Sequence, residues 1–191
     1  MFSSNFSENV FLSALGERCQ HCSPKAYALL DSTNTELCRL AREGAPEGTV
    51  IFADEQQKGR GRRGHTFFSP LSGLYMSLLL RPQAEVSPLH ITTAAAVAVA
   101  EAIEQLTGIP AGIKWVNDIY CNGKKVCGIL TEGAFFPGSA QLQYAVLGIG
   151  INVGLMEFPE ELREIATSVS NECGFEVSKE VLIDEVLKEL E

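Results

Sequence analysis

The sequence has few basic residues, with 15 lysines and arginines against 24 acidic residues and a formal net charge of −9 at pH 7. Nucleic acids and anionic membrane surfaces require a broad basic face, so this deficit argues against DNA and membranes as general partners. The sequence also lacks an apolar run that could span a bilayer, because the stretch 91–99 is short and contains two threonines. Residues 1–11 carry no basic segment before an apolar one, so we expect no signal peptide.

The six cysteines show no regular framework of the kind found in small secreted domains. Cys19, His21 and Cys22 have the spacing of half a zinc site, but no second pair of ligands follows at a suitable distance. We therefore expect no structural zinc and interpret this segment as part of an N-terminal helix. Cysteines without a framework are typical of a reducing compartment, so we expect a cytoplasmic protein.

The chain has enough apolar sequence for a folded domain, since 46% of its 191 residues are hydrophobic and 20% are charged. We expect a helical extension at 1–25 and one domain at 26–191. The predicted elements are a helix at 7–22, strands at 26–30, 49–54, 73–80 and 144–153, helices at 35–43 and 89–107, a two-stranded hairpin at 111–135, and a last helix from about 178 to the end. This mixture predicts an α+β fold with a mixed, largely antiparallel sheet packed with helices.

The predicted hairpin brings opposite charges together. Its turn is Asn122-Gly123, a strong two-residue turn signal. The resulting pairing sets Asp118 opposite Cys127 and places on one face Asp118, Tyr120, Lys125 and Cys127. If the first strand stays extended back to Lys114, that lysine joins them. An aspartate between two lysines can hold a metal ion or orient an amine, whereas the alternative is a surface salt bridge of little consequence.

A compact positive block stands out in this acidic chain. The segment 59–64, GRGRRG, holds three arginines and three glycines in six residues. So local a charge suits a small anion rather than a polymer, and glycines let the backbone approach a ligand closely. The alternative is a solvated surface loop.

Four segments, in this order and spacing, resemble the catalytic domain of biotin protein ligases. They are DSTN at 31–34, QQKGRGRRG at 56–64, KWVNDIY at 114–120 with KKVCGILTE at 124–132, and LGIGINV at 147–153. The resemblance implies the biotin–lipoate ligase catalytic fold, which is similar to that of class II aminoacyl-tRNA synthetases. It implies an enzyme that joins biotin to ATP, with Mg²⁺, giving biotinyl-5'-AMP and pyrophosphate. Biotin then passes to a lysine of a biotin carboxyl carrier protein.

The resemblance also implies roles for individual residues. The catalytic candidates are Lys125, Asp118 and Arg60; Lys125 would hold the biotin carboxylate and the α-phosphate, and Asp118 would either position Mg²⁺ or activate the acceptor lysine. The implied biotin contacts are Ser32, Thr33, Asn34, Gln56, Arg60, Gly61, Arg62, Lys125, Gly128 and Gly148. The implied ATP or adenylate contacts are Arg60, Arg62, Arg63, Phe67, Lys114, Asn117 and Asn152. Hydroxyls and amides suit the neutral urea ring of biotin. Ser32 or Thr33 can instead cap the following helix, and one hydroxyl can cap while its neighbour binds.

The sequence departs from the family pattern at several positions. Val116 replaces the usual proline, and His65 and Phe67 replace the commoner arginine and tryptophan. We expect no N-terminal helix-turn-helix and no C-terminal β-barrel, so DNA binding is not expected. Pairing of two copies through a sheet edge is known in the family. The alternatives are a lipoate ligase or lipoyl transferase, and a truncated form that binds biotin without turnover.

Overall fold

The computed structural model describes residues 23–83 and 85–190, which form one seven-stranded sheet. Along the sheet the strands run β1 (Ser23–Leu30), β2 (Thr49–Gln56), β3 (Gly73–Leu80), β7 (Leu142–Asn152), β6 (Lys124–Phe135), β5 (Asp118–Cys121) and β4 (Ala111–Lys114). Only β1 and β2 are parallel, and the other neighbours are antiparallel. This arrangement confirms the predicted α+β fold with a largely antiparallel sheet.

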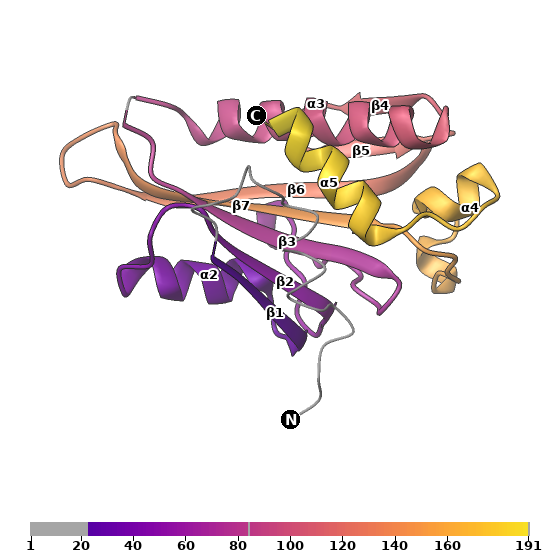
Figure 1. The fold of residues 1–191 in the computed structure, drawn as a ribbon, viewed down its shortest axis with the longest axis horizontal. Coiled ribbons are helices and arrows are strands. Elements are labelled where there is room, and N and C mark those ends of the chain that lie inside the picture. The colour runs from indigo at the N-terminus through magenta and orange to yellow at the C-terminus, as the bar shows by residue number, and fades with distance from the viewer. Residues whose placement is uncertain (1–22, 84, 191) are drawn as a thin grey trace.

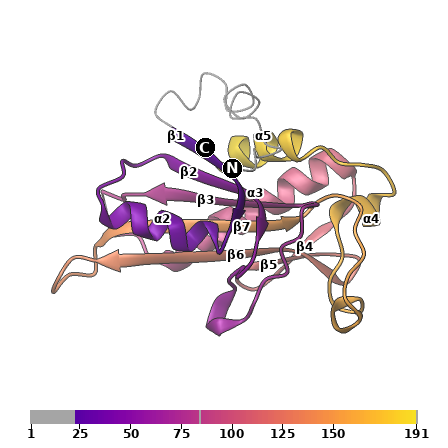
Figure 2. The same ribbon diagram turned by 90° about the horizontal axis from the view of Figure 1, so that it is seen from below.

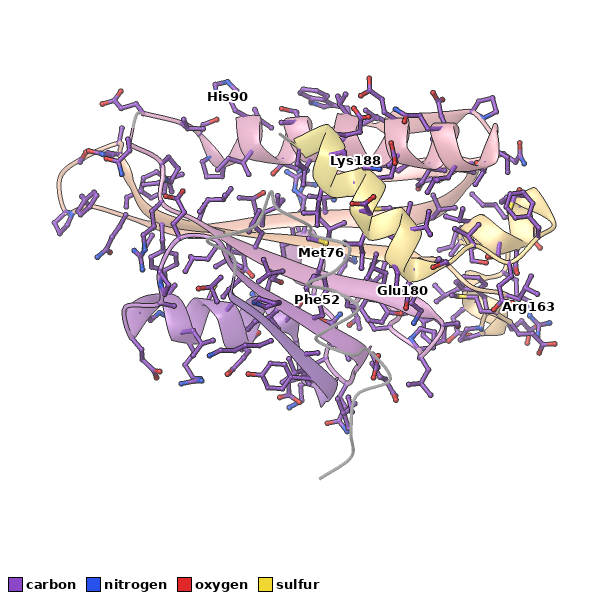
Figure 3. The ribbon with its side chains drawn as sticks, viewed as in Figure 1. Phe52, Met76, His90, Arg163, Glu180 and Lys188 are labelled. Carbon is purple, nitrogen blue, oxygen red and sulfur yellow. The ribbon has the colours of Figure 1, made fainter. Side chains whose placement is uncertain are left out.

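Helices cover both faces of the sheet (Figure 1). On one face lie α3 (Pro88–Thr107) and α5 (Lys179–Leu190), and on the other lies α2 (Thr33–Arg42). Strand residues alternate between these layers: Val50 and Phe52 join the core under α3 and α5, whereas Ile51 joins the core under α2. Phe52 and Met76, labelled in Figure 3, belong to the first of these cores. The molecule therefore has a helix–sheet–helix arrangement in which the two faces of the sheet have separate cores.

The long helix α3 shows how the sequence specifies an element. Ser87 caps its N-terminus by accepting a hydrogen bond from the His90 amide, Pro88 occupies the first turn, and Gly108 ends it with φ 70°. Its buried face is rich in alanine, including Ala95 and Ala102, so the helix axis can lie close to the sheet. The prediction that this helix packs on a sheet is confirmed.

Most of the predicted elements in the described part of the chain are present. The strand at 73–80 and the late helices agree with β3, α4 (Val169–Cys173) and α5, and short 3-10 turns lie at Arg62–Gly64 and Glu160–Leu162. The predicted helix at 7–22 and the Cys19–Cys22 segment lie outside the described residues. No helix within the described ranges has the length and apolar character needed to cross a membrane.

The predicted hairpin at 111–135 was wrong in two respects. Residues 111–121 are not one strand but two antiparallel strands, β4 and β5, which pair Lys114 with Asp118. The predicted Asn122-Gly123 turn is present, and both of its residues have positive φ angles. Beyond it the pairing shifts by a bulge, so that Asp118 lies opposite Gly128 and not Cys127. Because Val126 is the extra residue, Val126 and Cys127 both enter the core, and Cys127 does not share the face of Asp118.

Candidate functional site

The floor of the candidate site is a row of residues across the sheet on the α2 side, with glycines at its centre. Tyr75 on β3 pairs with Gly150 on β7, Gly150 pairs with Gly128 on β6, and Gly128 pairs with Asp118 on β5. Two residues along β7 from Gly150 and on the same face, Gly148 lies where an added Cβ would be 2.0 Å from the Asn34 Oδ1 atom. Glycines at these three positions therefore leave space above the sheet for other side chains and for a ligand.

A polar pocket forms where the N-terminus of α2 meets this floor. Its lining includes the predicted residues Ser32, Thr33, Asn34, Gln56, Arg60, Gly128 and Gly148, together with Phe67, Tyr75, Leu130 and Gly150. Ser32 occupies the N-cap position but makes no capping hydrogen bond through its side chain. Gln56 does this instead, because its Oε1 accepts from the Thr33 amide at 2.9 Å. The expectation that a hydroxyl caps this helix was therefore wrong.

Ser77 on β3 ties the pocket together, and sequence reasoning missed it. Its Oγ lies 2.8 Å from Thr33 Oγ1 and 2.7 Å from Asn34 Oδ1, with the whole residue buried. Asn34 in turn donates from Nδ2 to the Leu130 carbonyl and to Glu132 Oε2, both at 3.1 Å. The signal available in the sequence was a single serine inside an otherwise apolar strand.

The arginine-rich segment folds as a small hairpin between β2 and β3 and projects from the sheet in Figure 2. The Gly61 amide donates to the His65 carbonyl at 2.7 Å, and the Phe67 amide donates to the Gly59 carbonyl at 2.9 Å. Gly59 is required for close approach, since an added Cβ would lie 2.4 Å from the Phe67 carbonyl oxygen and from Ser69 Oγ. Arg63 adopts φ 55°, which a non-glycine residue rarely does.

The arginines and lysines border a cleft of about 490 Å³ beside the polar pocket. Its charged and polar lining includes Arg60, Arg62, Arg63, His65, Lys114, Asn117, Asp118 and Lys125. Arg62 donates to Asn117 Oδ1 at 3.0 Å, which joins the loop to the turn between β4 and β5. Five cationic side chains against one carboxylate make this cleft suited to a small, highly charged anion.

Lys125 and Asp118 meet as predicted, although through a different register. Lys125 Nζ lies 2.7 Å from Asp118 Oδ1, and Asn117 Nδ2 donates to the same oxygen at 2.9 Å. The backbone of Lys125 is held on its other side, where its amide donates to the Ile165 carbonyl and its carbonyl accepts from the Thr167 amide. Lys114 points toward the neighbouring ring of Tyr120, with its Nζ 5.2 Å from the ring centre.

Asn152 belongs to a third, more apolar cavity of about 170 Å³. The other residues that line this cavity include Phe67, Phe68, Tyr120, Phe158, Leu162, Ile165 and Ala166. Asn152 Nδ2 donates to the Thr167 carbonyl at 3.0 Å, which fixes the orientation of the amide. Its buried Oδ1 has no hydrogen-bond partner among the described residues. A buried acceptor without a donor is costly, so a ligand N–H here would gain a hydrogen bond.

Phe67 stands where the three cavities meet, because it lines the polar pocket, the charged cleft and the apolar cavity. Its ring lies over the glycine floor, so that an added Cβ on Gly150 would approach it to 2.8 Å and one on Gly128 to 3.0 Å. It also contacts Tyr75 edge-on, with ring centres 6.4 Å apart, and lies 5.6 Å from Lys125 Nζ. All the predicted site residues therefore fall into one continuous region.

Comparison with known proteins agrees with this region. The model of the biotin/lipoate A/B protein ligase family matches residues 26–152. The chain belongs to this family. As a family member it is similar to the bifunctional ligase/repressor BirA of Bacillus subtilis, with 42% identity over 165 residues that cover 84% of this chain and 50% of the relative. It is also similar to the biotin–[acetyl-CoA-carboxylase] ligase of Paracoccus denitrificans, with 36% identity over 82% of this chain and 67% of the relative.

Solved structures show the same family fold. The biotin protein ligase of Aquifex aeolicus in complex with biotin and ATP has a TM-score of 0.76 and 36% identity, over 88% of this chain and 68% of that one. The chain spans about half the length of the BirA relatives from Bacillus subtilis and Escherichia coli. In the described part of this ligase-family chain, no three histidine, cysteine or acidic side chains are grouped as a metal site.

Proposed function

We propose that this chain activates biotin with ATP and transfers it to a lysine of a biotin carboxyl carrier protein. The observation that carries the proposal is the meeting of three chemically different cavities at Phe67. One ligand would suit all three cavities if it had a polar neutral ring, an anionic centre and an aromatic base. These parts would match the polar pocket, the cationic cleft and the apolar cavity, where Asn152 Oδ1 is an acceptor without a donor among the described residues. Biotinyl-5'-AMP has these three parts in this order.

The hydrogen-bonding groups of the polar pocket suit the urea ring of biotin. Its hydroxyl and amide groups, on Ser32, Thr33, Asn34 and Gln56, can donate to the urea oxygen and accept from its two N–H groups. The apolar cavity fits adenine. Asn152 Oδ1 would accept from the exocyclic amine, while Phe67 and Phe68 offer rings for the base to contact.

The charged cleft between them would hold the reacting atoms. A carboxylate oxygen of biotin attacks the α-phosphorus of ATP, forming the C–O–P bond of the mixed anhydride as the bond to the β-phosphate oxygen breaks and pyrophosphate leaves. Lys125, Arg60 and Arg62 would stabilise the charge that develops on the phosphorus oxygens. In the second step the amine of the acceptor lysine attacks the anhydride carbonyl and AMP leaves. Lys125 is salt-bridged to Asp118, so it would act through electrostatic attraction and not as a nucleophile.

Mg²⁺ would accompany ATP in this cleft. It commonly binds through one or two carboxylates together with substrate phosphates, and Asp118 is the one carboxylate among the described residues that line the cleft. Asp118 would either hold Mg²⁺ or activate the acceptor lysine. Two relatives are biotin–[acetyl-CoA-carboxylase] ligases by name, and we propose the biotin carrier of that carboxylase as the acceptor. A cytoplasmic location and pairing of two copies remain predictions.

The family also includes lipoate ligases, which are the alternative function. Lipoate carries a dithiolane ring with no N–H or carbonyl group, so it would leave the polar groups around Ser77 and Asn34 without ligand partners. The polar lining of this pocket therefore favours biotin, whose urea ring can both donate and accept hydrogen bonds. A binding protein without turnover is disfavoured by the intact charged cleft.

ATP–pyrophosphate exchange tests the proposal directly, with biotin, with lipoate and with neither. We expect exchange with biotin only. Exchange with lipoate would assign the chain to the lipoate branch of the family. Calorimetric biotin binding without exchange would support the non-catalytic alternative, and transfer to a purified biotin carrier domain then tests the second step.

A further inference from the structure

Glu132 lies outside every role assigned above, yet it joins two parts of the candidate site. It stands on β6, and its side chain is 24% exposed. Its Oε2 accepts from Asn34 Nδ2 at 3.1 Å and from Arg60 at 3.1 Å, and its Oε1 lies 2.9 Å from a second Arg60 nitrogen. The Glu132 carboxylate therefore bonds both to the Asn34 amide in the polar pocket and to two nitrogens of Arg60 in the arginine loop.

The amide of Asn34 is fixed by these contacts. Both Nδ2 hydrogens have acceptors, the Leu130 carbonyl and Glu132, and Oδ1 lies 2.7 Å from Ser77 Oγ. Asn34 can therefore meet a ligand only as an acceptor, through the remaining lone pair of Oδ1. A ligand N–H bound there polarises the amide and strengthens the bond from Nδ2 to Glu132.

The other end of the connection is Arg60. This residue lines both the polar pocket and the charged cleft, and it stands at the base of the loop, paired with Thr66 across the loop. The planar guanidinium matches the carboxylate at two points, so Glu132 restrains the direction of Arg60 as well as its position. A shift in the position of the Glu132 carboxylate would therefore change the orientation of Arg60 at the base of the loop.

We propose that Glu132 is a positioning residue that couples the polar pocket to the arginine loop, so that biotin bound at Asn34 fixes Arg60 for the phosphate. This inference rests on the proposed function and deepens it. It predicts that biotin and ATP assist each other's binding through Glu132, since coupling between two sites is reciprocal.

The test compares the protein with the variant Glu132→Gln. The affinity for α,β-methylene-ATP, whose α–β bridge cannot be cleaved, is measured by calorimetry with and without saturating biotin. We expect biotin to tighten analogue binding in the parent by about tenfold or more, and the ratio to fall to about one in the variant. A glutamine has one acceptor oxygen and no charge, so it cannot hold Asn34 and the fork of Arg60 together.

Trypsin cleavage after Arg60, Arg62 and Arg63 gives a second measurement, which biotin should slow in the parent only.

Asp31→Asn is the matched control. It changes a carboxylate to an amide and removes the Asp31–Lys58 ion pair of 2.8 Å at the base of the same loop, a pair that includes neither Asn34 nor Arg60. It should keep the parent's ratio, and Glu132→Asp, which keeps the charge on a shorter arm, should give an intermediate one. A parent ratio near one, an unchanged ratio in Glu132→Gln, or an equal loss in Asp31→Asn would overturn the inference while leaving the proposed function standing. Absence of biotin-dependent pyrophosphate exchange in the parent would instead overturn the proposed function.

Discussion

At the scale of single residues, the site contains two kinds of residue, those that carry charge and glycines that leave space for other groups. Lys125 belongs to the first kind and Gly148 to the second, and both were identified from the sequence by resemblance. Neither identification required the fold, because four short segments already carried the pattern. The contacts that hold them, such as the Ser77 link between Thr33 and Asn34, needed the structure because they join residues about 43 positions apart.

Lys125→Ala should abolish adenylate formation while leaving the fold intact. The lysine lies in the cleft and is ion-paired with Asp118, and its loss would remove positive charge from the proposed phosphate site. We expect a decrease of at least about 100-fold in biotin-dependent pyrophosphate exchange. The neighbouring Lys124→Ala, whose ammonium contacts the Arg163 carbonyl, is the control and should keep the parent's rate. A Lys125→Ala variant as fast as the parent would refute the assigned role.

Gly148→Ala should weaken biotin binding by displacing Asn34. The added methyl would lie 2.0 Å from Asn34 Oδ1 and 2.7 Å from its Cγ, so the amide must move and its bonds to Ser77 and Glu132 must break. We expect the biotin dissociation constant to rise about tenfold or more, equivalent to ~1.4 kcal/mol. Gly112→Ala on β4 is the control, because its methyl would meet only the Tyr120 carbonyl at 3.9 Å. Equal affinities for biotin in the two variants would contradict this prediction.

Asn152→Ala should weaken ATP binding and leave biotin binding unchanged. Its Oδ1 is the buried acceptor that an adenine amine would satisfy, and the Thr167 carbonyl fixes which way the amide faces. We expect the KM for ATP to rise about tenfold and the preference for ATP over GTP to decrease, because guanine has an acceptor at the equivalent position. The biotin dissociation constant from calorimetry is the internal control. An unchanged preference for ATP would place adenine elsewhere.

At the scale of elements, the sequence predicted the regular strands better than their irregular joints. The β3 strand is apolar except for Ser77, lies between turn signals, and was predicted at both ends. The β5–β6 bulge was missed, because one extra residue in a ladder changes pairing without changing composition. The turn between β4 and β5 was missed as well, since Val116 gives no turn signal there. In the structure the side chain of Val116 is buried. These two joints bring Asp118 next to Lys125.

The arginine loop is the element on which retention of the intermediate should depend. Arg62 connects this loop to the β4–β5 turn through Asn117 Oδ1 at 3.0 Å, so Arg62→Gly detaches one side of the cleft. We expect biotinyl-5'-AMP to escape faster and nearby lysines to become biotinylated without specificity. Release is measured as free adenylate by chromatography, and Lys58→Ala at the base of the loop is the control. A leak equal to that of the parent would refute a retaining role for this loop.

At the scale of the whole molecule, the candidate site and the larger hydrophobic core lie on opposite faces of the sheet. The site lies on the α2 side, whereas α5 packs with α3 on the other, where Leu182, Ile183 and Val186 are buried in the larger core. Leu182→Ala should therefore lower the free energy of unfolding by about 2–5 kcal/mol, by loss of apolar contacts and creation of a cavity. The exchange rate per folded molecule, measured well below the melting temperature, should stay at the parent's value. Val181→Ala on the exposed side of the same helix should change stability by no more than about 0.5 kcal/mol. A Leu182→Ala variant that lost activity while folded would show that the sheet transmits changes from one face to the other, and the separation inferred from the alternating strand residues would be wrong.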